Sequence, residues 1–210
     1  MPNETDVVAL DIVKYTLGQA VKEKRMWVDT YQRNYSWQAG HVRDLYEDFE
    51  RTIKQGSAVE HFLGSVVAVA DGARSKIVDG QQRLATTTIL FAAMRDYFFE
   101  NGNKGKAEAY RSQYLTTINE DTLKAEPHLM LNTVDHNFFR SRILLDPDAE
   151  DRKLEESKLP TLSSHILLCE AASIAREYIG NITKGLSPGD ADEVITEWGS
   201  SGESVGEMQR

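Results

Sequence analysis

The sequence predicts an α+β fold in which a small mixed sheet with flanking helices is followed by a helical region. Two patterns carry this prediction. Residues 61–70 form a long β-type run, and the turn signal Asp71-Gly72 separates it from a second apolar run, as in an antiparallel hairpin. Elsewhere apolar residues recur at spacings of three and four, which places them on the buried face of a helix.

The first predicted elements are short. A capping box beginning at Thr16 predicts a helix over residues 17–24, and residues 26–28 follow as a brief strand. Ser36 is expected to cap the next helix, whose apolar residues recur at helical spacing until Gly56 ends it.

The hairpin and a long helix complete the predicted core. Residues 61–70 give the strongest strand signal, and residues 75–78 are expected to return antiparallel to them. A helix is expected over residues 81–100, because helical spacing continues through it even though the β-branched threonines at 86–88 have weak helix propensity. The Asn-Gly-Asn sequence at 101–103 is expected to stop it.

The second half is expected to be mainly helical, with a charged surface loop over residues 146–158 and a disordered Gly/Ser-rich tail over 199–210. The predicted organisation is a core over 1–115, an acidic helical region over 116–198 and the tail. The helices expected in the second half span residues 107–115, 135–145, 163–179 (capped by Ser163 or Ser164) and 188–198.

Composition sets limits on the class of protein. The 210 residues are 40% hydrophobic and 27% charged, as in a soluble globular protein. No run approaches the ~18 apolar residues of a membrane span, and the polar N-terminus is not expected to be a signal peptide. Cys169 is the only cysteine, which excludes an internal disulfide and a multi-cysteine zinc site. A cytoplasmic location without membrane contact is therefore expected.

The net charge is unevenly distributed. Residues 1–115 carry 15 basic and 15 acidic side chains, and the remainder carries 9 basic and 18 acidic, so the net charge of −9 lies in the second half. A broad nucleic-acid surface usually shows as a basic excess. Any DNA contact is therefore expected to be local and in the first half, or to depend on a partner. The acidic half is equally well explained as a solubilising surface.

The most informative segment is Asp79-Gly80-Gln81-Gln82-Arg83, between an apolar β-type run and a long apolar stretch. A strand would deliver the chain to a tight turn, and Gln81 to Arg83 would open a helix. Helix N-termini present unpaired N–H groups and partial positive charge, and an arginine adds donors suited to phosphate oxygens. This junction predicts an anion site; the alternative is a hairpin exit with solvated polar residues.

A second Gln-Arg pair, Gln32 and Arg33, follows the strand expected at 26–28. Tyr31, Tyr35 and Trp37 surround it, and an aromatic face can stack on a base. The alternative is an ordinary polar loop with packed aromatics. The functional interpretation is that the two Gln-Arg corners converge on one anion-accepting cleft.

Three segments carry a family resemblance: YQRNYSW at 31–37, HFLGSVV at 61–67 and IVDGQQRLATTTIL at 77–90. Together they resemble the N-terminal domain of GmrSD-type modification-dependent restriction systems, a domain of the ParB/sulfiredoxin-like superfamily. The resemblance covers about residues 10–145 and includes EPHLMLNTVDHNFFRSRIL at 126–144. It implies a domain that binds and usually hydrolyses a nucleotide (GTP or ATP, with Mg²⁺) and gates a nuclease acting on modified foreign DNA in anti-phage defence.

The resemblance also implies roles for individual residues. The nucleotide site would comprise Asp79, Gly80, Gln81, Gln82 and Arg83, with Gln32 and Arg33 facing the same cleft. Arg83 would hold phosphate oxygens, Asp79 would orient Mg²⁺, ribose or water, and one Gln would position the attacking water. The candidates for reading modified DNA are Tyr31, Tyr35 and Trp37.

The chain departs from the family pattern after this block. Neither the Asn- and Gly-containing box nor the His-containing nuclease domain is found, and the five scattered histidines include no pair with metal-ligand spacing on one helix. Each histidine is therefore expected to be a surface or capping residue. The expected protein is therefore the nucleotide-binding subunit of a split system with a separately encoded nuclease, or a shortened copy. The alternatives are a non-enzymatic module that senses DNA modification and an inactive interaction subunit.

Overall fold

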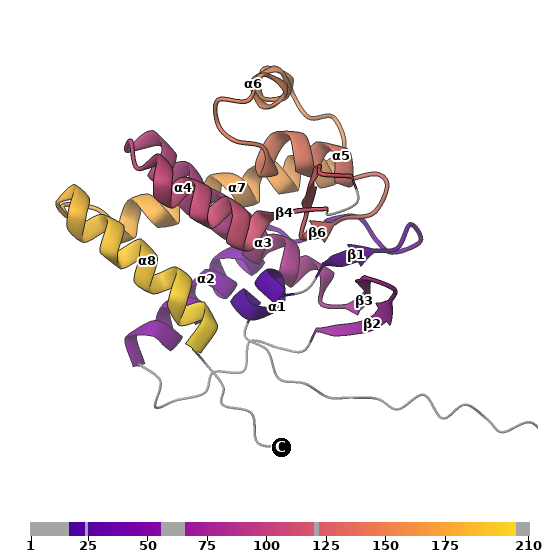
Figure 1. Cartoon of the computed structure of the whole chain (residues 1–210), viewed down its shortest axis with the longest axis horizontal. Coiled ribbons are helices and arrows are strands. Elements are labelled where there is room, and N and C mark those ends of the chain that lie inside the picture. The colour runs from indigo at the N-terminus through magenta and orange to yellow at the C-terminus, as the bar shows by residue number, and fades with distance from the viewer. Residues whose placement is uncertain (1–16, 24, 56–65, 120–121, 205–210) are drawn as a thin grey trace, which may run out of the picture.

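The computed structural model describes residues 17–23, 25–55, 66–119 and 122–204. Helices predominate in this part of the chain, and the strands gather at one side of the molecule (Figure 1). The elements in chain order are α1 (Leu17–Glu23), β1 (Met26–Val28), α2 (Ala39–Gln55), β2 (Val67–Asp71), β3 (Arg74–Asp79), α3 (Gln81–Glu100), α4 (Lys104–Tyr110), the π-helical segment η2 (Arg111–Leu115), β4 (Thr116–Ile118), β5 (Ala125–Pro127), β6 (Leu129–Met130), α5 (His136–Phe139), the π-helical segment η3 (Arg140–Leu144), α6 (Glu150–Glu156), α7 (Ser163–Ile182) and α8 (Pro188–Ser204).

A four-stranded mixed sheet has the strand order β2-β3-β1-β6. β1 runs parallel to both β3 and β6, and β2 is antiparallel to β3. This confirms the predicted α+β class and the predicted hairpin turn at Asp71-Gly72. Because β3, β1 and β6 run in the same direction, their carboxyl ends lie at one edge of the sheet. β4 and β5 form a separate antiparallel pair.

Helix α3 runs through the middle of the molecule, with α4, α7 and α8 around it (Figure 1). It begins at Gln81 and ends at Glu100, as the sequence predicts. The hydroxyls of Thr86, Thr87 and Thr88 donate to the backbone carbonyls one turn earlier, each at 2.9 Å. These bonds satisfy the hydroxyls inside a buried helix, so β-branched residues are tolerated there.

The hydrophobic core is continuous across the predicted boundary at residue 115. Met26 and Ile77 of the sheet, Leu129 of β6, Leu168 of α7 and Ile195 of α8 belong to one buried cluster. The second half of the chain therefore packs directly on the sheet and on α3, and β6 completes the sheet beside β1.

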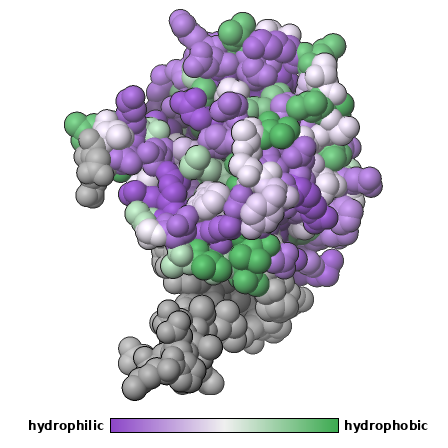
Figure 2. Space-filling view, turned by 90° about the vertical axis from the view of Figure 1, so that its right-hand side faces the viewer, coloured by the Kyte–Doolittle hydropathy of each residue, from purple (hydrophilic) through white to green (hydrophobic). Residues whose placement is uncertain are grey.

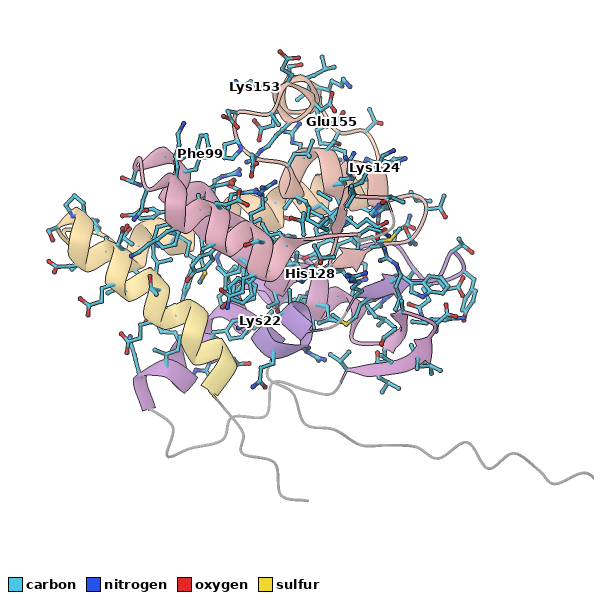
Figure 3. All side chains as sticks on the ribbon, viewed as in Figure 1. Lys22, Phe99, Lys124, His128, Lys153 and Glu155 are labelled. Atoms are coloured by element: carbon cyan, nitrogen blue, oxygen red, sulfur yellow. The ribbon has the colours of Figure 1, made fainter. Side chains whose placement is uncertain are left out.

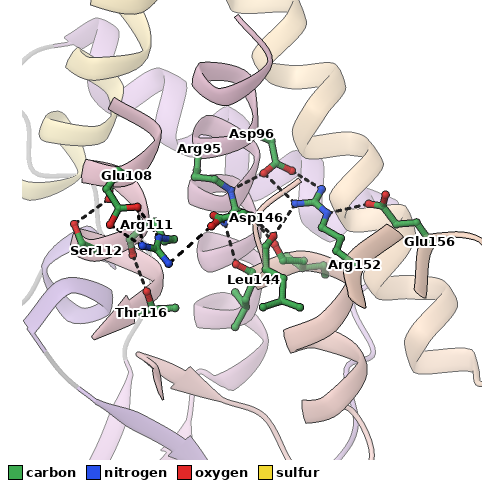
Figure 4. Close-up of polar contacts among 12 residues, drawn as sticks. Arg95, Asp96, Glu108, Arg111, Ser112, Thr116, Leu144, Asp146, Arg152 and Glu156 are labelled. Carbon is green, nitrogen blue, oxygen red and sulfur yellow. Dashed lines mark hydrogen bonds and ion pairs between the residues drawn. The ribbon is translucent and has the colours of Figure 1, made fainter. Parts of the chain in front are cut away.

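The sequence predicted a surface loop over residues 146–158. This prediction is wrong, because the segment contains α6. Arg152 of α6 is buried, and its Nη2 atom lies 2.6 Å from Oδ2 of Asp96 on α3. Asp96 also accepts a hydrogen bond from the fully buried Arg95 at 2.6 Å. Figure 4 shows this network joining α3 to α6 and to the end of η3.

Two predicted helix caps are wrong. Ser36 does not cap α2, which begins at Ala39. Neither Ser163 nor Ser164 caps α7, since Leu162 occupies the cap position. Ser164 instead donates a buried hydrogen bond to Asp135.

Helix α8 continues to Ser204 through part of the segment predicted as a disordered tail. Residues 205–210, the predicted capping box residue Thr16, the predicted helix end Gly56 and residues 61–65 of the predicted strand lie outside the described residues.

The described part of that strand, β2, is the sheet edge and is exposed along its length. Val67 and Val69 are 40% and 54% exposed. Figure 2 shows apolar side chains gathered low on this side of the molecule, where β2 lies in Figure 1.

Candidate functional site

The DGQQR segment forms the strand–turn–helix junction that the sequence predicted. Asp79 is the last residue of β3, and α3 begins at Gln81. Gly80 between them has φ of 90°, a left-handed conformation that glycine adopts without the steric cost of a Cβ atom. The N–H groups of the first turn of α3 are therefore presented just beyond the carboxyl end of β3.

The glutamines of this segment fasten the loop after β1. Gln82 uses both ends of its amide: Oε1 accepts from the backbone N–H of Ser36 at 2.8 Å, and Nε2 donates to the carbonyl of Asn34 at 3.1 Å. Gln81 Nε2 donates to the carbonyl of Arg33 at 3.1 Å. The two Gln-Arg corners thus lie side by side, although more than forty residues separate them.

Gln32 makes the reciprocal connection. Its Nε2 atom donates to the carbonyl of Ile77 in β3 at 2.7 Å. Asn132, from the loop after β6, donates through Nδ2 to the carbonyl of Gln32 at 3.1 Å and to the side-chain oxygen of Asn34 at 2.9 Å. Three loops that follow parallel strands are therefore tied together at the carboxyl edge of the sheet, the usual ligand edge of an open α/β sheet.

The three loops enclose a small polar recess. Its volume is about 10 Å³, the space of one water molecule. A nucleotide base does not fit inside, so a larger ligand would have to lie over the mouth. The recess is lined by Val28, Arg33, Tyr35, Gln81, Gln82, Ala85, Leu131, Asn132 and Asp135.

Asp135 is the residue of this recess that sequence reasoning missed, together with Asn132. It is 1% exposed. Oδ2 accepts from the backbone N–H of Tyr35 at 2.7 Å, and Oδ1 accepts from Ser164 Oγ at 2.5 Å. One signal could have revealed it: a polar Asn-Thr-Val-Asp stretch follows the apolar run at 129–131, just as DGQQR follows β3.

Two charged residues of the predicted site, Arg33 and Asp79, are more exposed than the glutamines. Arg33 is exposed and lines the recess. Arg83, in the first turn of α3, is partly exposed. Asp79 is exposed at the end of β3 and does not line the recess. Of these three charged residues, Arg33 alone lines the recess, and Arg83 lies in the neighbouring first turn of α3.

The three predicted DNA-reading aromatics have different environments. Tyr31 is 75% exposed, and the Lys76 ammonium lies 5.1 Å from its ring centroid. Tyr35 is buried, and its hydroxyl pairs with Thr86 at 2.8 Å, so it presents no ring face to a base. Burial raises the pKa of the Tyr35 hydroxyl. Trp37 is half-buried and stacks on His41.

Within the described ranges, no three His, Cys, Asp or Glu side chains gather as metal ligands would. His128, expected to be a surface or capping residue, is buried instead. Its Nδ1 atom lies 2.8 Å from the carbonyl of Val21, in the interior near α1 (Figure 3). Burial lowers the pKa of His128, since the charged form would lose its hydration.

The structure therefore defines an α+β domain with a polar recess where the loops after three parallel strands meet the start of a central helix. The family model described as GmrSD restriction endonuclease, N-terminal domain, matches residues 17–186. The chain belongs to this family, which confirms the resemblance seen in the sequence and assigns the chain to restriction systems. No curated protein matches the chain. Among the described helices, none has the length and apolar composition needed to cross a membrane.

Proposed function

We propose that this chain is a nucleotide-binding, NTP-hydrolysing regulatory component of a modification-dependent restriction system and acts with a nuclease. One observation carries the proposal. The bonds from Gln81 and Gln82 to the loop after β1 bring Arg33 beside the N-terminus of α3, where Arg83 lies. Two arginines at a helix N-terminus suit a polyphosphate.

The nucleotide, GTP or ATP, lies over the recess rather than in it. The recess has room for one water molecule, so the phosphates occupy its mouth near Arg33 and Arg83. Mg²⁺ needs few protein ligands when phosphate oxygens and waters complete its shell. The exposed carboxylate of Asp79 would be its protein ligand. The bound ion would neutralise phosphate charge; the chain's own residues position the phosphates.

Isothermal calorimetry tests the proposal. With non-hydrolysable GTP and ATP analogues and Mg²⁺, Arg33→Ala and Arg83→Ala are expected to weaken binding about tenfold to a hundredfold, the loss expected for a hydrogen bond to a charged group. Arg43→Ala is the matched control, since Arg43 forms an exposed pair with Glu177 away from the recess. Unchanged affinity in both site variants, with folding intact, would refute the nucleotide site.

Tyr31 favours a second function, direct sensing of modified DNA without a nucleotide. Its ring is exposed to solvent, and the Lys76 ammonium contacts it. Aromatic faces of this kind stack on exposed bases. A gel shift comparing modified and plain duplex, with and without nucleotide, separates the two functions. Binding that depends on Tyr31 but ignores nucleotide and Arg83 favours the sensing module. Binding of neither ligand, with copurification of a nuclease, favours an interaction subunit.

A further inference from the structure

The two glutamines of the DGQQR segment are not equivalent. Both ends of the Gln82 amide are engaged with the loop after β1, through Ser36 and Asn34. Gln81 engages only its nitrogen, which donates to the carbonyl of Arg33. Among the described residues, its buried Oε1 atom has no hydrogen-bond partner. A buried acceptor without a donor is costly, so Gln81, and not Gln82, has an acceptor to offer to a bound group.

Asp135 is the second acceptor at the same recess. Both Gln81 and Asp135 line it, and Asp135 is 1% exposed. Each carboxylate oxygen accepts one hydrogen bond, from Tyr35 N–H and from Ser164 Oγ. An ionised carboxylate has about four lone-pair sites, so it retains acceptor capacity. A space of about 10 Å³ beside two acceptors is the size and polarity that one water molecule requires.

We propose that the recess seats the attacking water of nucleotide hydrolysis, with Gln81 Oε1 orienting it and the Asp135 carboxylate acting as its general base. This assignment rests on the proposed hydrolysis. The water oxygen forms a bond to the terminal phosphorus as the bond from that phosphorus to the bridging oxygen breaks. The leaving nucleoside diphosphate takes the electron pair of the broken bond, and the water proton passes to Asp135. Inorganic phosphate is the second product.

The location of the phosphates supports this geometry. Arg33 lines the recess and also faces solvent, so a phosphate held by it lies directly above a water inside. Asp79, the carboxylate that the sequence suggested, is exposed at the end of β3 and does not line the recess. It can serve phosphate or Mg²⁺ but is not placed to take a proton from a water in the recess.

The experiment compares turnover with binding in the full chain. Asp135→Asn keeps the shape of the side chain and can still pair with Tyr35 and Ser164. The variant is therefore expected to fold, and its nucleotide affinity is expected to stay within twofold of wild type. Its kcat for GTP or ATP, measured with Mg²⁺ and with modified duplex present, is expected to fall about a hundredfold or more. Gln81→Ala is expected to reduce kcat with a smaller effect on affinity. Asp192→Asn, a partly buried carboxylate beside Lys106, is the matched control.

The outcomes separate the assignment from the function on which it rests. If the wild type hydrolyses the nucleotide and Asp135→Asn has the same kcat, the general-base assignment alone is overturned. An equal fall in kcat and in affinity shows that Asp135 only supports the loop, and also overturns it. Nucleotide binding without turnover, even with modified DNA and the nuclease added, refutes both the proposed hydrolysis and the general-base assignment. No nucleotide binding at all refutes the proposed function itself.

Discussion

The Asp135 carboxylate accepts a hydrogen bond from the backbone N–H of Tyr35 at 2.7 Å, across 100 residues of sequence. The same carboxylate accepts a hydrogen bond from the hydroxyl of Ser164 at the start of α7. The loop after β1 is therefore fixed from two sides, by Gln82 of α3 and by Asp135 of the loop after β6. Any ligand that moves this loop must also affect the contact with α7, which connects the recess to the helical second half.

Gln82→Ala is expected to loosen the loop after β1. The change leaves the backbone N–H of Ser36 and the carbonyl of Asn34 without their partner. Leaving such groups unsatisfied costs about 1–3 kcal/mol, so the free energy of unfolding should fall by this amount, and nucleotide affinity should fall with it. Urea denaturation and calorimetry measure the two effects. Gln38→Ala, at an exposed position of the same loop, should change neither.

The hairpin and the long helix were predictable because their signals are local. A β-type run around Asp71-Gly72 specifies the turn, and apolar residues at helical spacing specify α3. The start of α3 was predicted to the residue, since Gly80 supplies the conformation that the turn requires.

The missed features are long-range. Arg152 lies in a run of charges that resembles a solvated loop, and only its buried partner Asp96 turns that run into a packed helix. Asp135 and Asn132 join the recess through bonds to residues about a hundred positions earlier. The Asn-Thr-Val-Asp stretch marks a third loop locally, but no local pattern specifies the distant partners to which that loop binds.

Arg95→Ala is expected to destabilise the fold severely. Arg95 is fully buried; its guanidinium donates to Asp96 at 2.6 Å and to the carbonyls of Ile143 and Leu144 at 2.9 Å. Removing one partner of a buried ion pair costs about 3–5 kcal/mol. The unfolding midpoint in urea should shift accordingly. Arg51→Ala, which breaks only exposed pairs on α2, should cost under about 1 kcal/mol. Equal losses in both variants would contradict a structural role for the buried network.

Stability is expected to fall on mild acidification, in part because of His128. Burial lowers the pKa of His128 in the folded state, whereas the unfolded chain has the ordinary value of about 6.5. Below that pH the unfolded state binds more protons than the folded state, so the free energy of unfolding decreases as the pH falls from about 7.5 toward the lowered folded-state pKa. Burial lowers the pKa of His136 as well, which adds a contribution of the same sign.

The variant His128→Gln isolates the first contribution. Urea denaturation at a series of pH values between about 5.5 and 7.5 should show a shallower loss of stability in the variant than in the wild type, with the His136 contribution remaining. Parallel pH profiles would show that protonation of His128 is not coupled to unfolding.

Gly80→Ala is expected to damage the junction between β3 and α3. The φ of 90° at this position forces a Cβ atom into contact with the backbone and costs about 1–2 kcal/mol for a residue with a side chain. Since the turn presents the first N–H groups of α3, nucleotide affinity should fall together with the free energy of unfolding.

Gly40→Ala is the matched control, because Gly40 lies in the first turn of α2 with nothing within 4 Å of an added Cβ atom. That change should leave affinity unaltered and stability equal or slightly higher. A Gly80→Ala variant as stable as wild type would mean that the junction relaxes to a negative φ, and its calorimetry would then show whether the anion site needs the left-handed turn.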